Sequence, residues 1–352
     1  MRRRAFVGAL GGAGLALARW RDARGTVPAR HWTWVHGGAQ RTTDEWRGYF
    51  ARLRAAGIHG VHVVGGDTAT LSAVARDAGL VFSRWTWVLN RSDDARVKAE
   101  HPEWFTVSRE GKSSLTDPPY VPYYQWLCPT RPEVRAYLAG QLGAIARDPA
   151  VDEVHLDYVR HCDVILPVAL WPRYNLVQDR ELPPFDFCYC AVCRAAFRAQ
   201  TGRDPMTLAD PSADLEWRRF RWESVTGLVR EVARAVHAAG KPLTAAVFPT
   251  PAIARRLVRQ AWDEWPLDGV FPMLYQGFYN EPVSWIGSSV LEGRAALPAD
   301  RPLYAGLYLP DLTPATLREA VRGAMEAGAA GVSLFEADGL TEAHLEVVGA
   351  VR

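Results

Sequence analysis

The chain alternates between short β-like runs and helix-like segments along most of its 352 residues. Strands that alternate with helices form parallel βαβ units. Eight such runs recur, which predicts a single α/β domain folded as a closed (β/α)8 (TIM) barrel. This fold takes roughly 250 residues, so the chain is long enough for the barrel and for insertions in its loops. We expect strands at Trp32–His36, His59–Val64, Leu80–Val88, Val154–Tyr158, Leu243–Phe248, Gly269–Tyr275, Leu303–Tyr308 and Val332–Phe335.

Helix start signals support this alternation. Thr42 and Glu45 have the spacing of a capping box, and residues 215–239 carry a long 3.6-residue apolar period. Thr313 and Thr341 are N-cap candidates for the last two helices. An open doubly wound sheet is the alternative, but no Gly-x-Gly-x-x-Gly follows the first strand, which disfavours a dinucleotide-binding fold.

The first 18 residues have the pattern of an export signal, and we expect the barrel to occupy residues 27–352. Arg3 and Arg4 resemble a twin-arginine signal, and the apolar residues 5–18 are too few to span a bilayer as a helix, which takes about 20. Ala16-Leu17-Ala18 has the form of a signal-peptidase site. We therefore expect export to the periplasm or the extracellular space. An uncleaved basic N-terminal anchor is the alternative.

Charge and hydropathy argue against two classes of partner, nucleic acid and the membrane interior. Removing residues 1–18 takes away three arginines and changes the formal net charge from +2 to −1. A near-neutral protein has no electrostatic footprint for nucleic acid. No later stretch is apolar for long enough to cross a membrane, so we expect no stable membrane insertion after cleavage.

The segment before residue 158 places titratable groups on one face of a strand. Val154 and Leu156 alternate with Glu153, His155 and Asp157. The inward side chains near the C-terminal end of a barrel strand form the floor of an active site, which makes Asp157 our first catalytic candidate. The alternative is a buried, ion-paired Asp beside a structural His.

Two connections are much longer than ordinary loops, and both follow strand C-termini, after strands three and four. They run from Arg91 to about Arg131 and from Val159 to about Asp214, and both are rich in aromatic residues. Aromatic faces in a groove suit the apolar faces of sugar rings, so we expect a carbohydrate substrate. The alternative is that many of these rings only pack the loops onto the barrel. They include Trp104, Phe105, Tyr120, Tyr123, Tyr124, Trp126, Trp171, Tyr174, Phe185 and Phe187.

The cysteines form a compact motif. Cys188, Cys190 and Cys193 have a Cys-x-Cys-x-x-Cys spacing that suits thiolates on one tetrahedral ion, and Cys128 is our first choice for the fourth ligand, ahead of Cys162. A disulfide with spare thiols is the alternative in an exported protein.

This motif, from Cys128-Pro129 to Phe197-Arg198, resembles the structural zinc site of family 42 β-galactosidases. The resemblance implies that Cys128, Cys188, Cys190 and Cys193 bind structural zinc. We expect no cofactor for catalysis. Those enzymes carry an Asn-Glu pair after strand four and a second Glu on strand seven, whereas here strand four ends in Asp157. The β-galactosidase activity therefore does not carry over.

A broader resemblance extends across most of the chain that remains after the export signal. The order of motifs is similar to that of the glycosyl-hydrolase-like 10 family and related barrels, which implies an exported carbohydrate-active protein. The motifs are His101–Trp104, Gly111-Lys112, Trp126–Pro129, His155–Arg160, Trp217–Val236, Ala245–Pro249, Gln260–Trp265 and Phe271–Tyr275.

Glycoside hydrolysis needs two carboxyl groups, one as acid and one as nucleophile or base. Glu336 is our leading partner for Asp157 because it follows strand eight and should stand at the same rim. Asp311 and the pair Asp263 and Glu264 are alternatives, although the first suits a turn and the others a solvated helix end.

Further residues at strand ends are candidate substrate contacts. His155 and Arg160 could orient Asp157 or hold substrate groups, whereas Tyr158 is expected to face the helices. The alternative functions are a non-catalytic glycan-binding barrel and a metal-dependent hydrolase, for which a lone His-x-Asp lacks ligands. The remaining candidate contacts are His36, Asp67, Asn90, Trp126, Tyr275 and Gln276.

Overall fold

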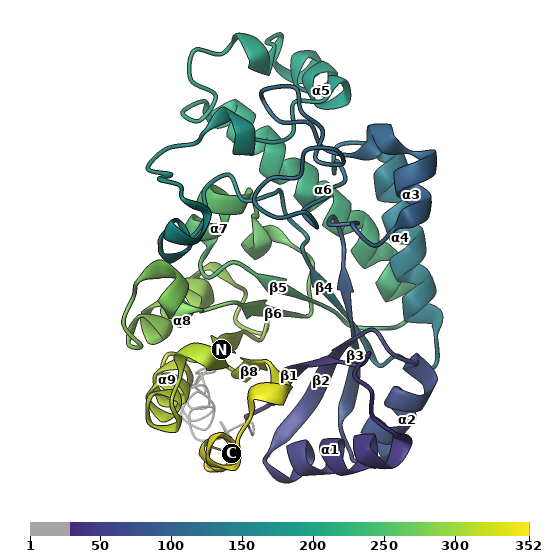
Figure 1. The fold of residues 1–352 in the computed structure, drawn as a ribbon, viewed down its shortest axis with the longest axis vertical. Coiled ribbons are helices and arrows are strands. Elements are labelled where there is room, and N and C mark those ends of the chain that lie inside the picture. The colour runs from purple at the N-terminus through teal and green to yellow at the C-terminus, as the bar shows by residue number, and fades with distance from the viewer. Residues whose placement is uncertain (1–28, 352) are drawn as a thin grey trace, which may run out of the picture.

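The computed structural model describes residues 29–351 and confirms the predicted barrel (Figure 1). The proposed export signal at residues 1–18 lies outside these residues. All eight strands are parallel, and the hydrogen-bonded order is β6-β5-β4-β3-β2-β1-β8-β7. The strands are β1 (His31–His36), β2 (Ile58–Val64), β3 (Val81–Trp87), β4 (Glu153–Asp157), β5 (Leu243–Val247), β6 (Gly269–Pro272), β7 (Tyr304–Tyr308) and β8 (Gly331–Phe335).

The two ends of this sheet, β6 and β7, meet and nearly close the barrel. Isolated parallel bridges join Val270 to Leu303 and Met273 to Gly306. A Cβ at Gly306 would lie 2.8 Å from the carbonyl oxygen of Pro272, so this close approach requires glycine.

Helices follow each strand and cover the outside of the barrel (Figure 1). The predicted capping box at Thr42 and Glu45 is present, and Asp214, Thr313 and Thr341 each cap a helix with their side chains. The helices are α1 (Thr43–Ala55), α2 (Thr68–Asp77), α3 (Ala95–Glu100), α4 (Pro132–Arg147), α5 (Ala191–Thr201), α6 (Leu215–Ala238), α7 (Pro251–Val258), α8 (Trp285–Ala296), α9 (Pro314–Glu326) and α10 (Glu342–Gly349). Within residues 29–351, none of them has the length and apolar character that a membrane crossing requires.

The two long connections contain α3 and α5 and extend beyond the barrel at one end of the molecule (Figure 1). Buried ion pairs fix the second connection to the barrel helices. Asp186 pairs with Arg221 on α6, and Glu181 pairs with Arg259 at the end of α7. A buried charge left without its partner is costly, so these pairs hold the connection in one position above the strand ends.

Candidate active site

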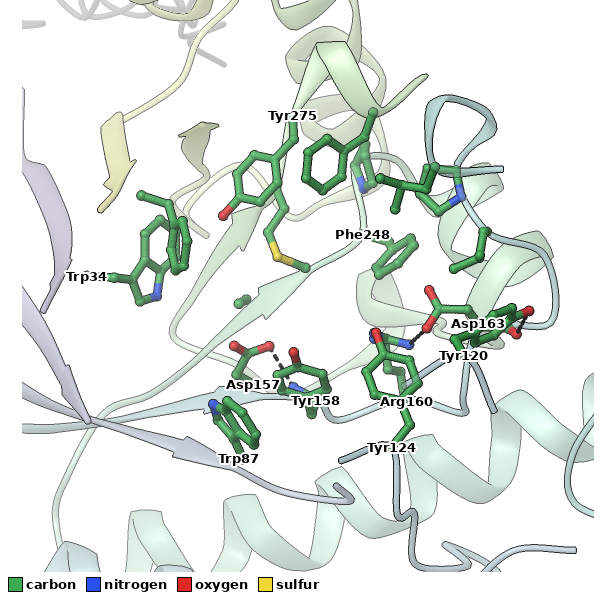
Figure 2. A pocket seen from close by; sticks show the side chains of 18 of the residues that line it. Trp34, Trp87, Tyr120, Tyr124, Asp157, Tyr158, Arg160, Asp163, Phe248 and Tyr275 are labelled. Carbon is green, nitrogen blue, oxygen red and sulfur yellow. Dashed lines mark hydrogen bonds and ion pairs between the residues drawn. The ribbon is translucent and has the colours of Figure 1, made fainter. Parts of the chain in front are cut away.

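A cavity of about 270 Å³ lies at the C-terminal ends of the strands (Figure 2). Side chains from the barrel and from both long connections line it, and aromatic rings form most of its walls. In the view of Figure 2, Asp157, Trp34 and Tyr275 lie at one end, and Arg160, Asp163 and Tyr120 at the other. The lining includes Trp34, His36, Trp85, Trp87, Tyr120, Tyr124, Asp157, Tyr158, Arg160, Asp163, Tyr174, Phe248, Met273, Tyr275, Phe278, Tyr279 and Phe335.

Asp157 stands at the C-terminal end of β4 and is partly open to solvent through the cavity. Its Oδ2 accepts a hydrogen bond from Nε1 of Trp85 at 3.0 Å, and its Oδ1 accepts one from the backbone N–H of Tyr158 at 2.6 Å. Burial raises the pKa of Asp157 to about 6, although these two hydrogen bonds and the charge of Arg160 favour the ionised form. A carboxyl group with such a pKa can carry a proton near neutral pH and is suited to general-acid chemistry.

Arg160 and Asp163 form a buried ion pair in the cavity wall. Nη1 of Arg160 donates to Oδ2 of Asp163 at 2.8 Å, and the guanidinium also lies over the rings of Trp126 and Phe248, each 4.9 Å from the ring centroid. Asp163 is the second carboxylate that lines the cavity, but Arg160 neutralises its charge. The predicted contact residue Arg160 therefore reaches the cavity, as part of a pair.

A closed layer lies below Asp157 in the barrel interior, and it contains Glu153 and His155. Oε1 of Glu153 accepts hydrogen bonds from the hydroxyls of Ser83 at 2.8 Å and Thr244 at 2.7 Å. Nε2 of His155 faces the indole N–H of Trp34 at 3.3 Å, so it acts as acceptor, and Nδ1–H donates to Thr244 at 2.9 Å. His155 is fully buried and does not line the cavity, so the structure places it beneath the site.

Burial controls protonation in this layer. It raises the pKa of Glu153 to about 7, lowers that of His155 to about 3, and lowers that of His62 well below its ordinary value. Ligand atoms of His62, Glu153 and His155 lie within 4.8 Å of one another. However, the two imidazoles stack at 3.7 Å with 21° between their planes, so one ion cannot lie in both ring planes, where the nitrogen lone pairs point. The layer is therefore better described as a polar part of the core.

Glu336 follows β8 and lies at the rim of the barrel, as the sequence predicts. Its Oε2 is 2.9 Å from Nε2 of His36, which ends β1. His36 lines the cavity, whereas Glu336 does not. The alternatives to Glu336 do not line the cavity either: Asp263 and Glu264 pair with Arg255 on α7, and Asp311, which follows β7, is exposed beside Gly277.

The other predicted contact residues divide into two groups. Tyr275 lines the cavity, and burial raises the pKa of its hydroxyl well above the ordinary value. Asn90, Trp126 and Gln276 are buried and do not line it. Trp126 lies behind the wall, where it supports Arg160. Asp67, also a predicted contact, is the N-cap of α2.

The expectation that Tyr158 faces the helices is wrong. Tyr158 lines the cavity because its φ of 49° is in the left-handed region, which ends the strand alternation after Asp157. Asp163 was not predicted, since nothing in an irregular loop marks which residue will face Arg160. Aromatic residues of both long connections, Tyr120, Tyr124 and Tyr174, reach the cavity, whereas Trp104 and Phe187 are buried in the core.

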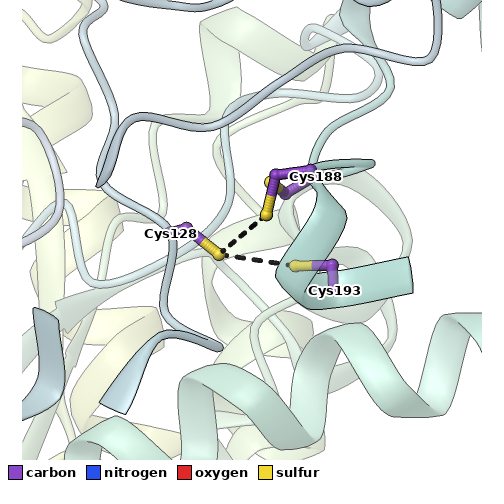
Figure 3. Close-up of side chains that lie close together, drawn as sticks. Cys128, Cys188 and Cys193 are labelled. Carbon is purple, nitrogen blue, oxygen red and sulfur yellow. Dashed lines mark hydrogen bonds between the residues drawn. The ribbon is translucent and has the colours of Figure 1, made fainter. Parts of the chain in front are cut away.

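The four cysteines predicted as metal ligands come together outside the cavity, where the first connection meets the start of α5 (Figure 3). Sγ of Cys128 is 3.4 Å from Sγ of Cys193 and 3.8 Å from Sγ of Cys190, and Cys188 completes the cluster. All four are buried free thiols. Four sulfur atoms at such separations suit a tetrahedral ion with Zn–S bonds of about 2.3 Å. Cys162, the second choice for the fourth ligand, is not part of the cluster.

Comparison with protein-family models finds no match, and comparison with curated proteins finds none. Solved structures share the fold. The glycoside hydrolase domain of PgaB (BpsB) from Bordetella bronchiseptica is 15% identical, with a TM-score of 0.61 over 92% of this chain and 99% of that one. The catalytic domain of β-amylase from Paenibacillus polymyxa is 10% identical, with a TM-score of 0.57 over 91% and 96% of the two chains. α-L-Fucosidase isoenzyme 2 from Paenibacillus thiaminolyticus is 14% identical, with a TM-score of 0.58 over 92% of this chain and 48% of that one.

Proposed function

We propose that this protein is an exported glycoside hydrolase that cleaves an oligo- or polysaccharide in the cavity at the mouth of the barrel. The observation that carries the proposal is Asp157, a carboxyl group at the cavity floor whose pKa burial raises to about 6. The aromatic walls suit the apolar faces of pyranose rings. The structures described above are a glycoside hydrolase domain, a β-amylase and an α-L-fucosidase, which supports glycan hydrolysis as the chemistry of this fold here.

In this proposal, Asp157 donates a proton to the leaving oxygen and Glu336 supplies the second carboxylate function at the rim. The test is incubation of the purified protein with a panel of oligosaccharides, followed by chromatography of the products. Hydrolysis by the wild-type protein supports the proposal. If no substrate in the panel is cleaved, the hydrolase proposal fails.

A glycan-binding barrel without activity is the second candidate. One observation favours it: Asp163, the only carboxylate besides Asp157 among the lining residues, is paired with Arg160. Oligosaccharide binding measured by calorimetry, without cleavage of any oligosaccharide in the panel, would replace the enzyme proposal with this one.

We further propose that Cys128, Cys188, Cys190 and Cys193 hold one structural zinc ion, which would fix the first connection against α5. Four thiolates would close the coordination shell and leave no position for catalytic water. Metal analysis of protein purified from the cytoplasm should give about one zinc per chain. A disulfide between any two of these cysteines in that material would argue against zinc.

Export completes the proposal. Replacement of Arg3 and Arg4 by lysine should leave precursor in the cytoplasm, because the twin-arginine pair is the feature read by that pathway. Normal secretion of the double variant would remove the twin-arginine interpretation and leave ordinary secretion open.

A further inference from the structure

His36 lines the cavity and has no role in the function proposed above. Among the titratable side chains that line the cavity, Arg160 and Asp163 neutralise each other. Burial raises the pKa of the lining tyrosines Tyr120 and Tyr158 above their ordinary value, so both hydroxyls stay protonated near neutral pH. Asp157 and His36 remain, and both are side-chain types that serve as general acids or bases in enzymes.

Glu336 contacts His36 and does not itself line the cavity. The two residues come from adjacent strand ends, because β1 pairs with β8. Nε2 of His36 lies 2.9 Å from Oε2 of Glu336, and both side chains are partly exposed, at 48% and 36%. The segment after Glu336 is held by Asp338, which accepts hydrogen bonds from Arg41 at 2.7 Å and Tyr49 at 2.8 Å. The carboxylate is therefore presented to His36 from a fixed backbone.

This contact places a carboxylate beside one nitrogen of the His36 imidazole. The negative charge of Glu336, 2.9 Å from Nε2, would stabilise the positive charge that develops on the ring when His36 takes up a proton in the reaction. No hydrogen bond to Nδ1 occurs within residues 29–351. Orientation of an imidazole by a carboxylate on one nitrogen, with the other free for the reaction, is a recurring arrangement in general-base catalysis.

Trp85 connects His36 to Asp157. The rings of His36 and Trp85 meet edge to face with centroids 5.3 Å apart, and Nε1 of Trp85 donates to Asp157 at 3.0 Å. One indole thus orients the proposed acid and packs against the imidazole.

We infer that His36 is the catalytic base of the hydrolysis and that Glu336 is a positioning residue that acts through it. The inference rests on the proposed function and changes the role of Glu336 from direct participant to partner of His36. Nδ1 of His36 takes a proton from water as the oxygen of that water bonds to the anomeric carbon. The bond from that carbon to the leaving oxygen breaks, and Asp157 gives its proton to the leaving oxygen. The products are a hemiacetal and an alcohol, and the proton on His36 returns to Asp157 through solvent.

Two consequences distinguish this mechanism from one with a carboxylate nucleophile. Direct attack by water inverts the configuration at the anomeric carbon, whereas a covalent glycosyl-enzyme retains it. In addition, the base is needed whatever the leaving group, but the acid is needed only when the leaving group is a poor one.

The experiment compares His36→Ala, Glu336→Gln and Asp157→Asn on two substrates. One is an oligosaccharide that the wild type cleaves, and the other is the 2,4-dinitrophenyl glycoside of the sugar it releases. His36→Ala should lose at least about 100-fold in kcat on both substrates, and added imidazole should restore part of it. Asp157→Asn should recover activity on the activated glycoside. Glu336→Gln should lose about 10-fold in kcat with little change in KM.

The matched control is His237→Ala, which removes another half-exposed histidine paired with a carboxylate at 2.9 Å, that of Asp268. This pair lies at the opposite end of the barrel, where β6 begins, so activity should not change. Circular dichroism of each variant checks folding. Inverted product, seen by NMR, together with imidazole rescue supports the inference.

Full activity of His36→Ala, or product of retained configuration, overturns the inference while hydrolysis by the wild type leaves the proposed function standing. If the wild type cleaves no oligosaccharide in the panel, the proposed function falls and the role of His36 falls with it.

Discussion

Glu153 and Asp157 lie on the same inward face of β4, two periods of the alternation apart, and yet their surroundings differ. Burial raises the pKa of both carboxyl groups, to about 7 and about 6. Glu153 lies in a closed layer and accepts hydrogen bonds from Ser83 and Thr244. Asp157 lies at the C-terminal end of the strand and borders the cavity. The difference teaches that a perturbed pKa marks a functional site only where the group can reach a ligand.

The largest expected difference between Glu153 and Asp157 is in their effect on catalytic activity. Asp157→Asn should reduce kcat on an oligosaccharide by about 10²- to 10⁴-fold, because the amide keeps the shape but cannot transfer a proton. Glu153→Gln should keep kcat within about 3-fold, since that residue touches no substrate. Steady-state kinetics on the two purified variants gives the answer. Equal losses in both would show that the lower layer takes part in the chemistry.

Much of this site was open to sequence reasoning, because alternation along a strand is local. The pattern of Glu153, His155 and Asp157 predicts three inward side chains, and it is confirmed for all three. It does not predict which layer opens to solvent, since depth depends on the register of neighbouring strands. His155, predicted as a substrate contact, lies in the closed layer for that reason.

Loop residues were the least predictable part of the site. The pair of Arg160 and Asp163 depends on an irregular backbone after β4, and the left-handed φ of Tyr158 has no periodic signal. The contact of His36 with Glu336 joins residues 300 positions apart, but it follows from the fold. In a closed eight-stranded barrel the first and last strands are neighbours, so their ends meet.

A smaller effect is expected in the pH dependence of the free energy of unfolding, to which Glu153 should contribute. The pKa of Glu153 is raised from 4.5 to about 7 on folding, so between these pH values the folded state binds more protons than the unfolded state. Stability therefore falls as pH rises through this window, by at most about 3 kcal/mol for this group. Glu153→Gln should remove that share of the pH dependence, seen in urea unfolding at pH 4.5 and pH 8. An unchanged slope in the variant would mean that Glu153 does not titrate in this range.

The smallest effect concerns the pH dependence of catalysis and tests Asp157 alone. A general acid must be protonated, and the pKa of Asp157 is about 6, so kcat/KM should fall about tenfold per pH unit above that value. The hydrogen bond from Trp85 favours the ionised carboxylate, so its loss in Trp85→Phe should raise the pKa and move the alkaline limb to higher pH. Trp87→Phe is the matched control, because Trp87 also lines the cavity while its indole Nε1 has no hydrogen-bond partner within residues 29–351. If both variants keep the wild-type limb, or if activity rises with pH above 6, then Asp157 is not the acid. Asp157 would then have to act as an ionised carboxylate.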